Sequence, residues 1–437
     1  MDRRKFLGTL TTAAVGGLSA TQTAVAADTQ LEPGTWYDAT VTDVTDGDTI
    51  DVTLDSDGTE YEIRVLGLDT PETRRNGRYE SVPEWEGIED DKYLSKWGEN
   101  ASDYAKNEFP DGTSVKIAVD EQEAEMDPFG RLLAYIKYDK NGDGSMDTLY
   151  NRDIIEQGYA RVYGSSLTKH DDFWSAEATA QSNGVGVWGR SDPANTSEVD
   201  DDPVSEVFFP NVSSVRTDTG GLADSRAPVS APSGSTQSLD GGYSYSGDIP
   251  LVGVDESVNT AMVGGLFISE EHDASGQHFV FLTNLIDSLS SKSGQVLIDG
   301  GHHQFNADYA LSNEDAVNYQ RYLEGQGIAF EQVNTFDGAG DNALSTARAI
   351  VVTSPYDAFT TAEKDALGTF VSNGGAVILM GSAKSSATAR SNLDDVASSL
   401  GSDLRLNDDQ VFNGSGDSNF QTQNIDTANF SLWSSYT

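Results

Sequence analysis

The 437-residue sequence contains no cysteine. This absence excludes disulfide bonds, thiolate nucleophiles, zinc–thiolate sites and a lipidated N-terminal cysteine. If the protein is exported, it must therefore be stable without covalent cross-links.

Basic residues are scarce: 27 Lys and Arg stand against 71 Asp and Glu, which gives a formal net charge of −44. The acids are spread over both halves, which favours adaptation to very high salt over an ordinary acidic protein with acidic tails. At about 1 M salt the Debye length is about 3 Å, so the self-repulsion of such a surface is largely screened. The same salt removes most of the gain from neutralising phosphates, so the net charge does not exclude a nucleic-acid partner.

Long apolar runs are lacking beyond the first residues, so no membrane span is expected there. At the N-terminus, Arg3 and Arg4 precede a mildly apolar run from Gly8 to Ala20 and an Ala24-Val25-Ala26 site. Residues 1–26 resemble a twin-arginine signal peptide, which exports folded proteins. The sequence thus predicts a secreted or cell-surface protein, with an uncleaved N-terminal anchor as the alternative.

The segment 36–190 has short alternating runs separated by Gly, Asp and Pro, followed by helical patterns. This order predicts a small β-barrel covered by helices. The expected strands are Thr40–Val44, Thr49–Leu54, Glu60–Leu66, Ser114–Val119 and Leu132–Tyr138, and the expected helices are Lys96–Phe109, Asn151–Gln157 and His170–Asn183.

The rest of the chain has two compositions. Residues 191–249 are rich in Ser, Gly, Pro and Asp, which predicts a linker. Residues 250–437 alternate strand and helix patterns, which predicts a three-layer α/β domain with a mostly parallel sheet. The expected elements include a helix at Asn313–Gln326, a strand at Ala349–Thr353 and a helix that opens with a capping box at Thr360–Glu363.

Acidic residues gather around two turns, in Asp46-Gly47-Asp48-Thr49 and in the run from Arg64 to Glu72. Asp48 and Asp69 are suited to hold a hard cation, and the backbone carbonyl of Thr70 can add a third oxygen. Glu72 lies three residues beyond Asp69 and can act as a general base or orient a water molecule. These residue types indicate phosphodiester hydrolysis.

Two arginines complete this predicted site. Arg64 lies near the end of an expected strand, and Arg131 follows a Gly turn that can direct it toward the same place. Arg remains charged and offers planar, bidentate donors to a phosphate.

These motifs resemble the staphylococcal-nuclease-like thermonucleases. The family's Asp-Gly-Asp-Thr, Arg-x-x-x-x-Asp-Thr-Pro-Glu and Tyr/Phe-Gly-Arg-x-Leu-Ala-Tyr signatures occur in order within residues 36–190. The resemblance implies a five-stranded OB-fold barrel and one Ca²⁺ ion held by Asp48, Asp69 and Thr70. It also implies Glu72, Arg64 and Arg131 as catalytic residues and DNA and RNA as substrates, cleaved to 3′-phosphate-ended products. The sequence departs from the family pattern in an acidic insertion at 74–93 and in a scarcity of surface lysines. The residues expected to stack on bases of the substrate are Phe129 and Tyr163.

Three weaker patterns lie outside this site. Asp139, Asn141 and Asp143 match the start of a calcium loop, so a second Ca²⁺ site and an acidic hairpin turn are both open. Asp299, His302 and His303 follow an expected strand. They could be metal ligands at the end of the sheet or ordinary loop residues, and both alternatives are open. The C-terminal half is loosely similar to the class I glutamine-amidotransferase-like fold, but without cysteine it cannot perform that chemistry.

The sequence therefore predicts a secreted, Ca²⁺-dependent nuclease whose C-terminal domain binds an unknown ligand. The alternative is a secreted binding protein that uses the barrel as a nucleic-acid tether and the C-terminal domain for its main ligand.

Overall fold

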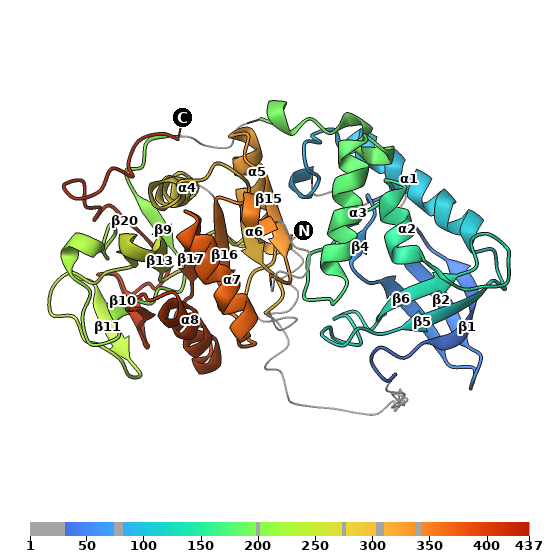
Figure 1. Cartoon of the computed structure of the whole chain (residues 1–437), viewed down its shortest axis with the longest axis horizontal. Helices are drawn as coiled ribbons and strands as arrows, with labels where there is room; N and C mark the ends of the chain where they lie inside the picture. Colours follow the sequence, from blue (N-terminus) through green and yellow to red (C-terminus); the bar gives the residue numbers. More distant parts are fainter. Residues whose placement is uncertain are drawn as a thin grey trace, which may run out of the picture.

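The computed structural model describes residues 31–73, 82–197, 202–272, 277–302, 310–336 and 343–436. Its N-terminal half, blue to green in Figure 1, lies beside its C-terminal half, yellow-green to red. The predicted signal peptide and His303 lie outside the described residues, as does the 74–81 part of the acidic insertion. Within the described ranges, no helix is both long and apolar enough to cross a bilayer.

Five strands of the N-terminal half form a closed barrel with the order β3-β2-β1-β5-β6, in which β3 and β6 pair in parallel and close the ring. They are β1 (Tyr37–Val44), β2 (Thr49–Leu54), β3 (Glu60–Val65), β5 (Ser114–Ala118) and β6 (Leu132–Tyr138). The barrel interior is filled by alternate apolar residues such as Ile50, Val52 and Ile117, which are almost fully buried. The five-stranded barrel expected from the sequence is therefore confirmed.

Three helices cover this barrel: α1 (Asp91–Glu108), α2 (Tyr150–Glu156) and α3 (His170–Ser182). Helix α1 begins five residues before the predicted start because the side chain of Asp90 accepts hydrogen bonds from the Lys92 and Tyr93 amides. Short elements complete this half: η3 (Val82–Glu84), β4 (Leu68–Asp69), β7 (Thr148–Leu149), β8 (Arg161–Val162), η4 (Gly186–Arg190) and η5 (Pro193–Asn195).

The C-terminal half is built on a six-stranded sheet with the order β12-β13-β17-β16-β14-β15. All neighbouring pairs are parallel except the antiparallel edge pair β12 and β13. The strands are β12 (Val252–Asp255), β13 (Thr260–Val263), β14 (Val296–Asp299), β15 (Phe330–Val333), β16 (Ala349–Thr353) and β17 (Ala376–Met380). The mostly parallel sheet matches the sequence expectation.

Helices cover both faces of this sheet, and alternate strand residues therefore belong to two separate hydrophobic cores. Ile298 and Ile378 pack with α4 and α5, whereas Leu297 and Leu379 pack with α7 and α8. Thr360 and Glu363 form the predicted capping box of α7. The helices are α4 (His278–Leu289), α5 (Val317–Gly325), α6 (Ala343–Thr346), α7 (Thr361–Ser372) and α8 (Ala387–Ser399), with turns η7 (Glu256–Val258) and η8 (Glu314–Ala316).

The expected linker is wrong for residues 202–249, which are part of the C-terminal half. Their strands pair with strands about 170–215 residues later in the chain, and Val207, Phe209 and Val212 are fully buried. The pairs are β9 (Val207–Phe209) with β20 (Phe420–Thr422), β10 (Val215–Thr217) with β18 (Leu404–Leu406), and β11 (Thr236–Leu239) with β19 (Asp409–Phe412); η6 spans Asp224–Arg226. The polar composition concealed these strands because each is only three or four residues long.

A buried ion-pair cluster lies where β14 ends. His302 Nδ1 is 3.0 Å from Asp299 Oδ1, and Nε2 is 3.2 Å from Glu363 Oε1. Burial alone would lower the pKa of His302, but the two carboxylates outweigh it and raise the pKa to about 10. The imidazolium therefore joins the loop after β14 to the start of α7.

The stability of this half should depend on the charge of His302. The stabilisation is complete below the unfolded-state pKa of 6.5 and is lost as pH rises toward about 10. Between pH 6.5 and 10, the free energy of unfolding of the parent should therefore approach that of His302→Gln in denaturant titrations. As a control, His278 is buried with its pKa lowered to about 3, so the parent and His278→Gln should differ by a constant amount in this range. A constant difference for His302→Gln as well would contradict the assigned charge.

Candidate active site

The Asp46–Thr49 turn joins β1 to β2 and places Asp48 inside the protein, 8% exposed. A Cβ atom on Gly47 would lie 2.7 Å from Thr70 Cγ2 and 3.0 Å from Ala101 Cβ. Only glycine therefore allows this turn to lie so close to Thr70 and helix α1.

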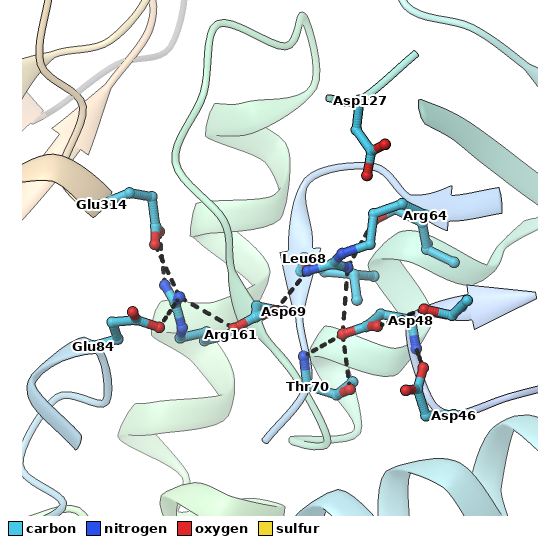
Figure 2. A network of polar contacts seen from close by, with 12 residues as sticks. Asp46, Asp48, Arg64, Leu68, Asp69, Thr70, Glu84, Asp127, Arg161 and Glu314 are labelled. Carbon is cyan, nitrogen blue, oxygen red and sulfur yellow. Dashed lines mark hydrogen bonds and ion pairs between the residues drawn. The ribbon is translucent and has the colours of Figure 1, made fainter. Parts of the chain in front are cut away.

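The end of β3 brings Arg64 to this turn, because Arg64 is the register partner of Thr49. Its guanidinium donates to the Leu68 carbonyl (2.8 Å) and to Asp69 Oδ1 (2.6 Å), and it lies 3.3 Å from Asp48 Oδ2. Figure 2 shows Arg64 between these two carboxylates. The hairpin thus places Arg64 on the same side as the acids.

Thr70 completes the convergence of the two segments. Its amide and its hydroxyl both donate to Asp48 Oδ2, at 2.9 Å each. Asp48, Arg64, Asp69 and Thr70 therefore form one hydrogen-bonded unit, although Asp48 and Thr70 are 22 residues apart.

The charges in this unit are strongly coupled. Burial would raise the pKa of Asp48, but Arg64 and the hydrogen bonds from Thr70 outweigh it and lower the pKa. Burial would lower the pKa of Arg64, but Asp48 and Asp69 raise it. Burial, aided by the charge of Asp48, raises the pKa of Asp46 to about 7. Asp48 and Asp69 therefore share the guanidinium of Arg64, and Asp46 lies beside Asp48.

The chemistry of these donors fits a hard divalent cation. The buried carboxylates of Asp48 and Asp69 both contact the guanidinium of Arg64. An adjacent cation would balance the remaining negative charge of the acidic groups. Among the residues that the structure describes, no group of three or more His, Asp or Glu side chains is placed to hold a metal ion. The fit therefore rests on two carboxylates supplemented by backbone and water oxygens.

Glu72 lies on the next segment and is half-buried. A Cβ atom on Gly98 of α1 would lie 2.1 Å from the Pro71 carbonyl oxygen and 3.0 Å from the Glu72 carbonyl carbon. The backbone that carries Glu72 therefore lies directly against α1.

Arg131 lies just before β6 and is held by Asp127. Its Nε donates to Asp127 Oδ2 at 2.7 Å, and its guanidinium lies 5.6 Å from the Phe129 ring centre. Leu133 is the register partner of Arg64, so the start of β6 lies beside the end of β3. Arg131 lies two residues before that pair, and the contacts observed for its guanidinium are those to Asp127 and Phe129.

The two expected stacking residues differ in exposure. The side chain of Phe129 is 72% exposed at the tip of its turn. Tyr163 is half-buried after β8, its amide donates to the Gly67 carbonyl, and its side chain contributes to the raised pKa of Arg64. Tyr163 therefore lies close to Arg64, and Phe129 lies beside Arg131 at the tip of its turn.

The turn at Asp139 uses its side chains to bind its own backbone. Asp139 accepts hydrogen bonds from the amides of Gly142, Asp143 and Gly144, and Asn141 accepts one from the Asp143 amide. These hydrogen bonds are those of an acidic hairpin turn. Among the described residues, the turn has no group of three acidic or histidine side chains placed to bind a metal ion.

Comparison with known proteins places this arrangement in a family. A sequence model described as Staphylococcal nuclease homologue matches residues 62–190, which include Arg64, Asp69 and Arg131. An uncharacterized protein of Methanocaldococcus jannaschii, MJ1439, is 38% identical over 157 residues, 36% of this chain and 73% of that protein. The N-terminal region belongs to the staphylococcal nuclease homologues.

Two relatives of this nuclease homologue have a named activity. The thermonucleases of Staphylococcus hyicus and Staphylococcus intermedius are 28% and 26% identical to it over 149 residues, 34% of this chain and 73% of each relative. The C-terminal half therefore lies largely outside the matched region.

The structure adds residues to the site of this nuclease homologue that the sequence did not reveal. Arg161 lies 3.3 Å from Asp69 Oδ2, and it also pairs with Glu84 and Glu314. Glu314 is 153 residues from Arg161 and belongs to the C-terminal half. No local motif marks a pairing between two domains, so sequence spacing could not have found it.

Proposed function

We propose that the protein is a secreted, Ca²⁺-dependent nuclease that hydrolyses DNA and RNA to 3′-phosphate-ended products. The observation that carries this proposal is the joining of Asp48, Arg64, Asp69 and Thr70 in one hydrogen-bonded unit on a barrel of the nuclease-homologue family. The expected N-terminal signal supports secretion.

Calcium, when bound by Asp48, Asp69 and the Thr70 carbonyl, would neutralise charge on the non-bridging phosphate oxygens. The chain's own residues do the rest. Arg64 and Arg131 donate hydrogen bonds to the phosphoryl oxygens, where negative charge grows. A Glu72 carboxylate oxygen takes a proton from the attacking water as the water oxygen bonds to phosphorus. The bond from phosphorus to the 5′-oxygen then breaks with its electron pair on that oxygen, which takes up a proton from solvent water, and the phosphate stays on the 3′-oxygen.

Substrate binding in concentrated salt has to depend on contacts other than general charge attraction. Stacking of bases on aromatic rings is less sensitive to salt than phosphate pairing. The exposed ring of Phe129, beside Arg131, supports such a contact, which would favour unpaired strands whose bases are free to stack.

Digestion of denatured DNA tests the proposal directly. In about 2 M salt, where the surface charge is screened, we expect cleavage with Ca²⁺ and none with a chelator. The products should become substrates for 3′-end extension only after phosphatase treatment, because they carry 3′-phosphates. Cleavage that resists the chelator, or no cleavage with Ca²⁺, would instead favour the binding protein that uses its barrel as a nucleic-acid tether.

A further inference from the structure

Arg161 is a buried arginine at the boundary between the two halves of the protein. It lies on β8, which pairs antiparallel with β4, so that Arg161 is the register partner of Asp69. Its side chain is 4% exposed. A buried guanidinium has to be paired to be tolerated, so its partners determine its position.

Three carboxylates from three segments hold this guanidinium. Glu314 binds it with both oxygens, at 2.7 and 2.9 Å, and Glu84 Oε2 lies at 2.7 Å. Asp69 Oδ2 lies farther away, at 3.3 Å. Figure 2 shows Arg161 between Glu84 and Glu314 on one side and Asp69 on the other.

Asp69 is therefore held by an arginine on each side. Its Oδ1 accepts from Arg64, and its Oδ2 faces Arg161. The direction of the Asp69 carboxylate thus depends on where Arg161 lies, and Glu314 provides the two-oxygen contact to Arg161.

Glu314 is itself fixed by the contact between the domains. It accepts a hydrogen bond from the Gly164 amide at 3.0 Å, and its side chain is 9% exposed. Beside it, Gln332 and Asn334 donate to the Ser165 carbonyl, at 3.0 and 2.7 Å. The C-terminal half therefore holds Glu314 against the strand that carries Arg161.

We propose that Glu314 is a positioning residue through which the C-terminal domain sets the calcium affinity of the nuclease site. This inference rests on the proposed function, because it assigns Asp69 as a calcium ligand. Glu314 and Glu84 hold Arg161 so that its bond to Asp69 Oδ2, at 3.3 Å, is longer than its bonds to the two glutamates, and this weaker bond leaves Oδ2 able to contact a cation as well. Three carboxylates share one guanidinium, so Glu314 also adds to the negative charge that attracts the ion.

Both effects act in the same direction when Glu314 is neutralised. In Glu314→Gln, Arg161 loses its strongest partner and moves toward Asp69, and the cluster loses a negative charge. Loss of a direct partner of a metal ligand typically costs about 10–100-fold in affinity. Glu314 acts on Asp69 through Arg161, so we expect a weakening at the lower end of this range, about 10-fold.

Isothermal titration of the full-length protein with CaCl₂ in about 2 M NaCl tests the proposal, because the salt screens weak binding to the acidic surface. Glu324→Gln is the matched control. Glu324 also belongs to the C-terminal half and accepts from a barrel-side amide, that of Gly87, at 3.1 Å, but it pairs with Arg321. We expect Glu324→Gln to bind Ca²⁺ with parental affinity.

Parental affinity in Glu314→Gln, or an equal loss in Glu324→Gln, would overturn the proposal, because the second result would show a general loosening of the interface. If Glu314→Gln does not fold, Glu84→Gln removes another partner of Arg161 and should weaken binding in the same way. A parent that binds Ca²⁺ but cleaves nothing would overturn the proposed function alone, while a parent that binds no Ca²⁺ would overturn both.

Discussion

Arg64→Ala should lower the turnover of denatured DNA by about 10³–10⁵-fold, the range for arginines that stabilise a transferring phosphoryl group. Arg64 contacts both Asp48 and Asp69, so it could reach a phosphate bound next to the cation that these two residues are proposed to hold. Single-turnover cleavage at saturating Ca²⁺ measures this loss separately from metal binding.

Arg64→Ala also leaves two buried carboxylates without their shared partner, so folding has to be checked by circular dichroism. Arg131→Ala avoids this difficulty, because the Arg131 side chain is 26% exposed and pairs with Asp127 alone among the ion pairs observed in the described residues. Arg190→Ala is the control, because Arg190 is 64% exposed and stacks on Tyr93. If Arg131→Ala cleaved at the parental rate, its turn would not belong to the site.

Asp48→Asn should weaken Ca²⁺ binding by more than about 100-fold, beyond the 10–100-fold typical of an outer-shell change. Asparagine keeps an oxygen that can accept from the Thr70 amide and hydroxyl, but it removes the charge that a hard cation needs. Calcium titration of the parent and the variant in concentrated salt measures the change.

The control is Asp143→Asn in the Asp139 turn. Asp143 accepts from the Ser145 amide and from Asn141, so the variant should leave both the affinity and the number of bound ions unchanged. Parental Ca²⁺ affinity in Asp48→Asn would contradict its assignment as a ligand, and a lower stoichiometry in Asp143→Asn would show a second Ca²⁺ site.

Features that depend on near neighbours were predictable from the sequence. Strands β2, β6 and β16 have the expected bounds, because alternating or continuous apolar residues between turn residues define a strand locally. The convergence of Asp48, Arg64 and Asp69 could also be predicted from the sequence, because one hairpin and two tight turns connect these residues.

Features that depend on distant partners were not predictable. The short strands at Val207–Phe209 and Val215–Thr217 are stable only beside partners from the end of the chain, so their own composition suggested a linker. The pairing of Arg161 with Glu314 likewise requires the docking of two domains. No sequence motif around either residue indicates that the two form an ion pair.

The pairing of strands from residues 207–239 with strands from residues 404–422 also determines the order of folding during synthesis. The barrel is complete when residue 190 has left the ribosome, whereas these three strands remain unpaired until almost the whole chain has emerged. At about 5–20 residues per second, this interval lasts about 10–40 s. Pairing with the segment 404–422 therefore protects the edges of these three strands from association with other chains only late in synthesis.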